Sequence, residues 1–302
     1  MRRACVVLPS ALLGGVLTAC GSPTAGIIPD ASATAAPVTL TFVPDAPLGG
    51  EAYVCFGFDV GAAVRAAGIN AIAWEPAVGA AVTLHHGKLY VVNAAYPPGP
   101  VPCDQQPTGA IPLHTWAAGG APLLLPADVA FAVPGDAVSL VIEAHVYRFA
   151  EGPPMADRVR LKMAGADVEV RAGWSARNAP VPALRPGQLE MSTDACTLAT
   201  AMHVYFAWPH EHLLGHSFTA AVTGSGGVIT LVDVPSWDFA RQAAVAVDAD
   251  LAAGDLLNLT CTWLNSTDRY VLPGPRTTDE MCGLGLIVSP PLGAELPCLP
   301  AN

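Results

Sequence analysis

The stretch AVSLVIEAHVYRF, residues 137–149, decides the fold class, because apolar and β-branched side chains alternate with polar ones along it. A period of two is the pattern of a β-strand. Similar runs recur along the chain, among them PVTLTFVP (37–44), AVTLHHGKLYVV (81–92), TAMHVYFAW (200–208) and LLNLTCTWL (256–264). Gly, Pro, Asp and Asn separate them at intervals of roughly ten residues, as in antiparallel sandwiches. We therefore expect an all-β fold.

The length of the chain allows one large domain or two ordinary ones, and we expect two such sandwiches in tandem. The segment WSARNAPVPALRPGQLE (174–190) reads as a bridge between two halves. We place the N-terminal domain at residues 37–175 and the C-terminal domain at 176–302. The 29 glycines and 29 prolines also argue against long helices.

The first residues have the pattern of an export signal. Arg2 and Arg3 precede a short apolar run that is too short to span a membrane. The sequence LTAC, ending at Cys20, resembles a bacterial lipobox, although an ordinary signal peptide cleaved elsewhere is the alternative. We expect a signal peptide over 1–19, a lipid on Cys20 and a flexible tether over 20–36. The protein would then be exported to the bacterial cell envelope, on the periplasmic side or at the outer-membrane surface, with the lipid as its sole membrane contact.

The charge of the chain excludes one class of partner. Its formal net charge is −11, and Lys88 and Lys162 are its only lysines. Such a chain is a poor candidate for binding nucleic acid. We expect a monomer whose partners are small molecules.

The cysteines have a different meaning in an exported protein. Without Cys5 and Cys20, six remain, at 55, 103, 196, 261, 282 and 298. An even number in an oxidising compartment favours three disulfides, for which 15 connectivities exist. Zinc is the alternative, but no pair has the CxxC spacing of a zinc site.

The stretch FAWPHEHLLGHSF (206–218) concentrates three of the eight histidines. A zinc-protease helix requires His-Glu-x-x-His, and here the second histidine is missing, while Pro209 and Gly215 oppose a helix. On a strand, His210 and His212 would point to one side and could bind one metal ion. Two exposed histidines at a sheet edge are the alternative.

Three more histidines lie in strand-like runs. His85 and His86 are adjacent, so they would face opposite ways unless the strand twists or bulges, which Gly87 could permit. His145 alone in an apolar strand is more often a core residue than a ligand. Met281, likewise, normally fills a core. Taken together, five imidazoles and one thioether suit copper better than zinc.

The motifs HHGKLYV (85–91), AHVYRF (144–149), MHVYFAWPHEHLLG (202–215) and DEMCGLGLIV (279–288) resemble the copper type II, ascorbate-dependent monooxygenases. The family includes peptidylglycine α-hydroxylating monooxygenase and dopamine β-monooxygenase. The resemblance runs from about Pro37 to Pro300, judged by the order and spacing of the motifs. It implies two jelly-roll-like domains, each with one copper, facing a solvent-filled cleft.

The resemblance also implies a role for individual residues. His85, His86 and His145 would hold an electron-transfer copper. His210, His212 and Met281 would hold the oxygen-activating copper and form the catalytic centre. The implied disulfides are Cys55–Cys103, Cys196–Cys298 and Cys261–Cys282. His203, His114 and His216 would be structural or lie outside the copper ligands.

The chain departs from the peptide-amidating enzyme at the residues that hold the peptide's carboxyl end. Trp208 stands in place of an arginine, and Gly283 and Gly285 in place of an asparagine and a tyrosine. A carboxylate would lose its charge-assisted hydrogen bonds there. We therefore expect a roomier, more apolar pocket, and a substrate other than a glycine-extended peptide.

The resemblance implies hydroxylation of a C–H bond of a small organic substrate with O2 and a one-electron reductant such as ascorbate. Two other classes of function remain open at this stage. One is a non-catalytic envelope lipoprotein that binds or buffers copper through the same ligands. The other is a sandwich module for glycans or proteins, in which the histidines are incidental.

Overall fold

The structure, a computed structural model, describes residues 36–103, 106–165, 168–274 and 276–300. Strands dominate it, and α1 (Ala62–Ala67) is the one helix within these ranges. The all-β expectation is confirmed. The strands of the first half are β1 (Val38–Phe42), β2 (Glu51–Asp59), β3 (Ile69–Glu75), β4 (Val82–Val92), β5 (Val101–Pro102), β6 (Ile111–Ala117), β7 (Leu123–Leu124), β8 (Val129–Phe131), β9 (Ser139–Arg148) and β10 (Asp157–Met163).

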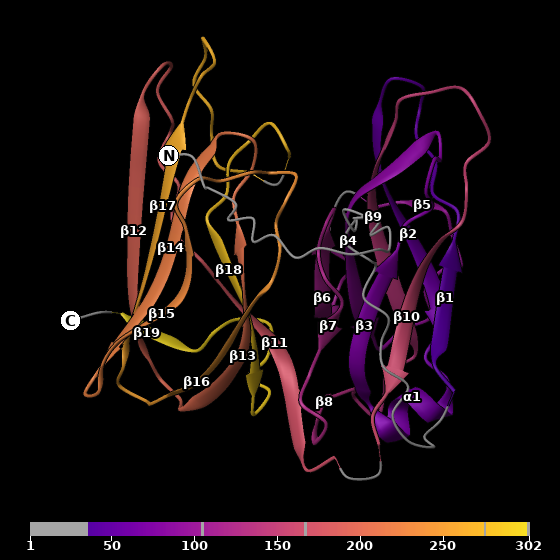
Figure 1. Cartoon of the computed structure of the whole chain (residues 1–302), viewed down its shortest axis with the longest axis horizontal. Coiled ribbons are helices and arrows are strands. Elements are labelled where there is room, and N and C mark those ends of the chain that lie inside the picture. Colours follow the sequence, from indigo (N-terminus) through magenta and orange to yellow (C-terminus); the bar gives the residue numbers. More distant parts are fainter. Residues whose placement is uncertain (1–35, 104–105, 166–167, 275, 301–302) are drawn as a thin grey trace, which may run out of the picture.

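The second half begins with the strand that connects the two. Its strands are β11 (Val170–Asn178), β12 (Leu189–Leu198), β13 (Met202–His210), β14 (Gly215–Gly224), β15 (Gly227–Val234), β16 (Val245–Leu251), β17 (Leu256–Leu264), β18 (Gly283–Ser289) and β19 (Cys298–Pro300). Figure 1 shows the two halves side by side, with β11 running between them.

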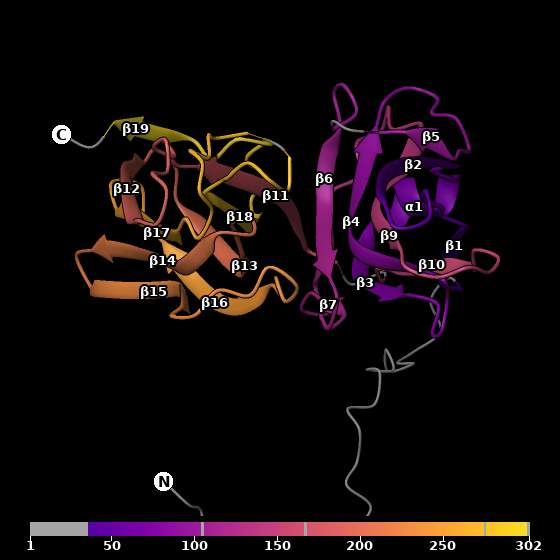
Figure 2. The same ribbon diagram turned by 90° about the horizontal axis from the view of Figure 1, so that it is seen from above.

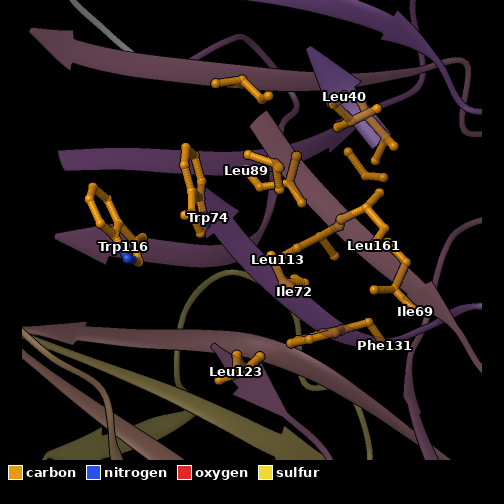
Figure 3. Close-up of a cluster of buried hydrophobic side chains, with 14 of the residues drawn as sticks. Leu40, Ile69, Ile72, Trp74, Leu89, Leu113, Trp116, Leu123, Phe131 and Leu161 are labelled. Carbon is orange, nitrogen blue, oxygen red and sulfur yellow. The ribbon is translucent and has the colours of Figure 1, made fainter. Parts of the chain in front are cut away.

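The core of the first half lies between two sheets. One has the order β5-β2-β9-β4-β6, and the other consists of β1, β10, β3 and β8 at one end of a nine-stranded sheet. Leu89 of the first sheet meets Ile72 and Leu161 of the second in one buried cluster (Figure 3). Because side chains alternate along a strand, Glu143 and His145 of β9 point away from this core, toward the second half.

The core of the second half is built in the same way. The sheet β15-β14-β17-β12-β19 packs on β11, β18, β13 and β16 of the nine-stranded sheet. In β17, Leu257, Leu259, Cys261 and Trp263 are buried, and the residues between them are partly exposed. This alternation is that of a strand with one face on the core.

Three disulfides lie within the halves. They join Cys55 to Cys103, Cys196 to Cys298 and Cys261 to Cys282. These are the pairs that the resemblance implies. The six cysteines are thus consumed in disulfides, which leaves none of them to bind zinc.

The nine-stranded sheet runs through both halves. Residues 170–172 of β11 pair in parallel with 129–131 of β8, and residues 173–178 pair antiparallel with 283–288 of β18. The expected boundary between 175 and 176 therefore falls inside β11, and the division into tandem domains stays a prediction. Seen from above in Figure 2, β4 and β6 lie on the side of the first half nearest β11, β18 and β13.

No helix among the described residues is long and apolar enough to cross a membrane. The expected signal peptide (1–19), Cys20 and all but the last residue of the expected tether (20–36) lie outside the described ranges.

Candidate copper site

Three histidines converge on the face of β4 and β9 that looks toward the second half. His86 and His145 are cross-strand neighbours, and the register shifts between Leu84 and His86, so His85 is the extra residue of a bulge. The bulge brings both adjacent imidazoles to one place, as expected. Gly87 is required for another reason, because a Cβ there would lie 2.4 Å from the ring of Trp74. The structure thus brings together His85, His86 and His145, with ligand atoms within 4.8 Å of one another.

The nitrogens of this histidine triad are arranged for a cation. The Nδ1 atom of His86 lies 3.4 Å from that of His85 and 3.3 Å from that of His145. Burial lowers the pKa of all three imidazoles, that of His86 well below its usual range, so all are neutral near pH 7. Facing lone pairs repel unless a proton or a metal ion lies between them. Three neutral imidazoles fit copper in either oxidation state.

Two neighbours fix the orientation of His145. Its Nε2 lies 2.8 Å from Oε2 of Glu51, so the ring nitrogen donates to the carboxylate and leaves Nδ1 free to accept a metal. The ring of Tyr53 stacks on the other side at 4.1 Å, with an interplanar angle of 3°. A carboxylate that holds the outer nitrogen of a histidine is a common arrangement around protein-bound metals.

The second pair of histidines lies across a cavity of about 590 Å³ from the triad. His210 ends β13 and His212 follows it outside the strand, with ring centroids 5.0 Å apart. Nδ1 of His210 donates to Oε1 of Gln242 at 2.7 Å, and Nδ1 of His212 donates to the carbonyl of Asp279 at 3.0 Å. Both Nε2 atoms therefore carry a lone pair. Burial lowers the pKa of His210 to about 3, so the ring is neutral.

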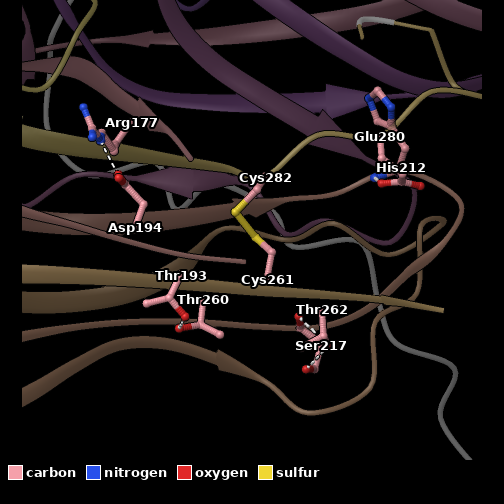
Figure 4. The surroundings of a disulfide bond; sticks show 10 residues. All are labelled: Arg177, Thr193, Asp194, His212, Ser217, Thr260, Cys261, Thr262, Glu280 and Cys282. Atoms are coloured by element: carbon pink, nitrogen blue, oxygen red, sulfur yellow. Dashed lines mark hydrogen bonds and ion pairs between the residues drawn. A yellow bond between two sulfur atoms is a disulfide. The ribbon is translucent and has the colours of Figure 1, made fainter. Parts of the chain in front are cut away.

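Met281 lines the same cavity as His86, His210 and His212. The residues beside it are held on both sides (Figure 4). Cys282 forms the disulfide with Cys261 of β17, and the Glu280 carboxylate accepts the backbone N–H groups of His212, at 2.9 Å, and Leu214, at 2.7 Å. The half-buried Met281 is thereby held in the wall of the cavity that the two imidazoles also line. Two nitrogens and a soft sulfur are a suitable donor set for Cu(I).

The segment 235–244, which we call the strap, was not recognised from the sequence. It connects β15 to β16 and contacts both histidine groups. Trp237 Nε1 donates to the His212 carbonyl at 3.0 Å, and Gln242 accepts from His210. The ring of Phe239 lies 5.0 Å from that of His85 and 6.2 Å from that of His212. An aromatic side chain therefore stands between the two groups, where the resemblance implies a solvent-filled cleft.

Gln242 is expected to tune the second site through His210. Gln242→Leu removes the acceptor that keeps the proton on Nδ1, so the proton can move to Nε2 and block the ligand atom. We expect roughly tenfold weaker copper binding at this site and unchanged binding at the triad, since outer partners of metal ligands typically contribute 10–100-fold. Copper titration followed by paramagnetic resonance would separate the two sites. Gln188→Leu, in an exposed turn, is the control, and equal losses at both sites would contradict the assignment.

Glu211 is buried between the two histidines with its side chain toward the core. Among the described residues, neither of its carboxyl oxygens has a hydrogen-bond partner. Burial, and then the nearby Glu280, raise the pKa of Glu211 to about 9. Burial also raises the pKa of Glu280, to about 7. Glu211 is therefore protonated at neutral pH in the metal-free protein.

This raised pKa makes stability depend on pH. Between pH 4.5 and 9 the folded state retains a proton that the unfolded state has released, so the free energy of unfolding falls as pH rises. The loss by pH 7 is about 3 kcal/mol, from about 1.4 kcal/mol per pH unit. In the metal-free protein, Glu211→Gln is expected to make this slope shallower between pH 5 and 8, leaving the smaller share that comes from the raised pKa of Glu280. Urea unfolding tests it, with the exposed Glu295→Gln as control, and an unchanged slope would rule out a buried neutral Glu211.

The remaining histidines lie apart from both groups. His114 is buried and accepts a hydrogen bond from Trp74 Nε1 at 3.0 Å; burial lowers its pKa to about 3. His203 contacts Asp250 at 2.8 Å and Asp248 at 3.2 Å at the surface. His216 is exposed.

The structure agrees with the expected apolar character of the pocket but not with the expected extra space at Gly285. Trp208 and Gly285 do make an apolar wall, but the space opened at Gly285 is filled by Trp174. A Cβ on Gly285 would lie 2.2 Å from that ring. No pattern in the sequence indicates this contact, because Trp174 comes from the connecting strand β11.

Comparison with known proteins bears on the second half. Residues 178–288 match the profile of the C-terminal domain of copper type II ascorbate-dependent monooxygenases, a range that contains His210, His212 and Met281 but not the histidine triad. No curated protein matches the chain.

Structures from infectious bursal disease virus are among the solved structures similar to the chain. The Gx strain structure is 8% identical over 84% of this chain and 71% of that chain, with a TM-score of 0.23. The VP2 subviral particle has the same identity and coverage, with a TM-score of 0.22. TM-scores this low carry no argument.

Proposed function

We propose that this chain, whose residues 178–288 belong to the C-terminal domain family of copper type II ascorbate-dependent monooxygenases, hydroxylates a C–H bond of a small organic substrate. The reaction would consume R–H, O2, two electrons and two protons and would yield R–OH and water. Ascorbate or a similar one-electron reductant would supply the electrons. Copper, when bound, supplies the oxygen activation and the single-electron steps that amino-acid side chains cannot provide.

The observation that carries this proposal is the placement of two separate donor sets around one cavity. His86 faces it from the first half, and His210, His212 and Met281 face it from the second. A protein that only stores copper needs no space between its ligands. A cavity of about 590 Å³ bordered by both sets leaves room for a substrate.

The protein residues would divide the work between the two sets. The triad, held by Glu51 and Tyr53, would keep one copper as the electron reserve. The pair fixed by Gln242 and Asp279, with Met281, would hold the copper that meets O2. Phe239 would keep bulk water out of the space between them, which limits the wasteful release of reduced oxygen.

The decisive experiment measures copper and product together. Copper-loaded protein is expected to contain about two ions per chain, by the count of donor sets. With ascorbate and O2, it should form hydroxylated product in proportion to oxygen consumed. Two bound coppers without any product across hydrocarbons, amines and peptides would favour a copper-binding protein instead. Copper near zero would favour a sandwich module with incidental histidines.

We further propose that the protein is a monomer held at the cell envelope by a lipid on Cys20. The support is the sequence pattern at residues 1–20. Cys20→Ser is expected to release the protein from the membrane fraction, as fractionation and immunoblotting would record. A variant that stays in that fraction would contradict the anchor.

A further inference from the structure

A second, smaller cavity of about 170 Å³ adjoins Met281 and His210. Two indoles form much of its wall. Trp208 stacks on His210 with centroids 4.8 Å apart, and its Nε1 donates to the Gln242 carbonyl, so its polar atom already has a partner. Trp174 lies 6.0 Å from Trp208 and covers Gly285. The indoles therefore give the cavity an aromatic wall, beside polar lining residues that include Gln106, Thr115 and Asn178.

The charge of this cavity is balanced. Among the described residues that line it, Lys88 is the one with a formal charge. Its ammonium lies 3.3 Å from Oε1 of the buried Glu143, and the Tyr90 hydroxyl donates to Oε2 of the same carboxylate at 3.0 Å. The pair is neutral as a whole. A charged ligand would lose its hydration without gaining an unpaired counter-charge.

Two indoles could in principle attract a cation through their faces. Here the ammonium of Lys88 lines the same cavity and already pairs with Glu143, so no unpaired carboxylate among the described lining residues is left for a cation. The size of the cavity is also informative. An apolar cavity of about 150 Å³ is known to accept benzene, so about 170 Å³ has room for one ring.

We infer that the substrate presents an uncharged, ring-sized apolar group, which binds in this cavity against the wall that Trp174 and Trp208 form together, with its C–H bond toward Met281 and His210. This inference rests on the proposed function, because it calls the ligand of the cavity a substrate. The binding preference itself can be measured without turnover. On this inference, the residues that determine specificity are Trp174, Trp208 and the Lys88–Glu143 pair. The first two set shape, and the pair sets charge.

The test uses three ring-sized probes: toluene, its cationic equivalent N-methylpyridinium, and benzenesulfonate. Calorimetric titration of copper(II)-loaded protein without reductant gives their Kd values. We expect toluene to bind at least about tenfold more tightly than either ion. Equal or tighter binding of an ion by the parent protein would overturn the inference.

Two substitutions reverse the charge balance in opposite directions. Glu143→Gln leaves Lys88 unopposed and should strengthen benzenesulfonate binding about tenfold. Lys88→Met leaves the carboxylate unopposed and should strengthen N-methylpyridinium binding instead. Lys162→Met, on β10 in the other sheet, is the matched control and should change nothing. If one variant fails to fold, the other still tests the role of the Lys88–Glu143 pair. An unchanged order of the three Kd values in a folded variant would overturn that role.

The two levels of the proposal fail separately. Selective toluene binding without oxygen-coupled product from any neutral aromatic compound would leave the pocket assignment standing and would contradict the proposed function. Hydroxylation of charged compounds in preference to neutral ones would contradict the pocket assignment alone.

Discussion

Replacing His86 by alanine is expected to lower the copper content from about two ions per chain to about one. His86 is the central member of the triad, since its Nδ1 atom is the common neighbour of the other two at 3.4 and 3.3 Å. Without it, only two nitrogens remain, and they belong to different strands. Turnover should fall at least about 1,000-fold, or about 4 kcal/mol, because the electron reserve is lost.

Metal analysis after copper loading and desalting measures the first effect, and product formation with ascorbate measures the second. His216→Ala removes an exposed histidine outside both groups and is the matched control. If the His86 variant keeps two coppers and parental turnover, the triad is not a copper site. If it loses copper but keeps turnover, the triad binds copper without serving the reaction.

Met281→His is expected to keep both coppers yet lower turnover at least about 1,000-fold. A third imidazole still holds the ion, but the substitution removes the soft thioether that favours Cu(I). The position should tolerate the change, because Met281 is half-buried and borders cavities. The variant's copper should therefore resist reduction by ascorbate.

The loss of the Cu(II) resonance signal on adding ascorbate under anaerobic conditions tests that expectation directly. Met191→His, at a methionine that is 65% exposed on β12, controls for the added imidazole. Parental turnover by the Met281 variant would show that the thioether has no role in the chemistry.

Much of the fold could be predicted because its strands are patterned locally. LLNLTCTWL coincides with β17 (Leu256–Leu264), and AVSLVIEAHVYRF contains β9 (Ser139–Arg148). β12 (Leu189–Leu198) was not predicted, since its sequence is rich in polar residues and most of it is only partly buried. The nine-stranded sheet that both halves share could not be predicted either. Pairing between strands that are far apart in the chain produces no recognisable pattern in the sequence of either strand.

For the candidate site, too, the residue types could be predicted from the sequence and their arrangement could not. The sequence by itself determined which side chains could act as donors, namely five imidazoles and one thioether, and that two adjacent histidines could share an ion only across a twist or bulge. Only the tertiary structure decided which atoms face each other, that Gln242 and Phe239 of the strap contact the histidines, and that Trp174 fills the space above Gly285. The physical reason is range. Side-chain chemistry and strand alternation are properties of neighbouring residues, whereas a metal site and a cavity depend on packing between segments far apart in the chain.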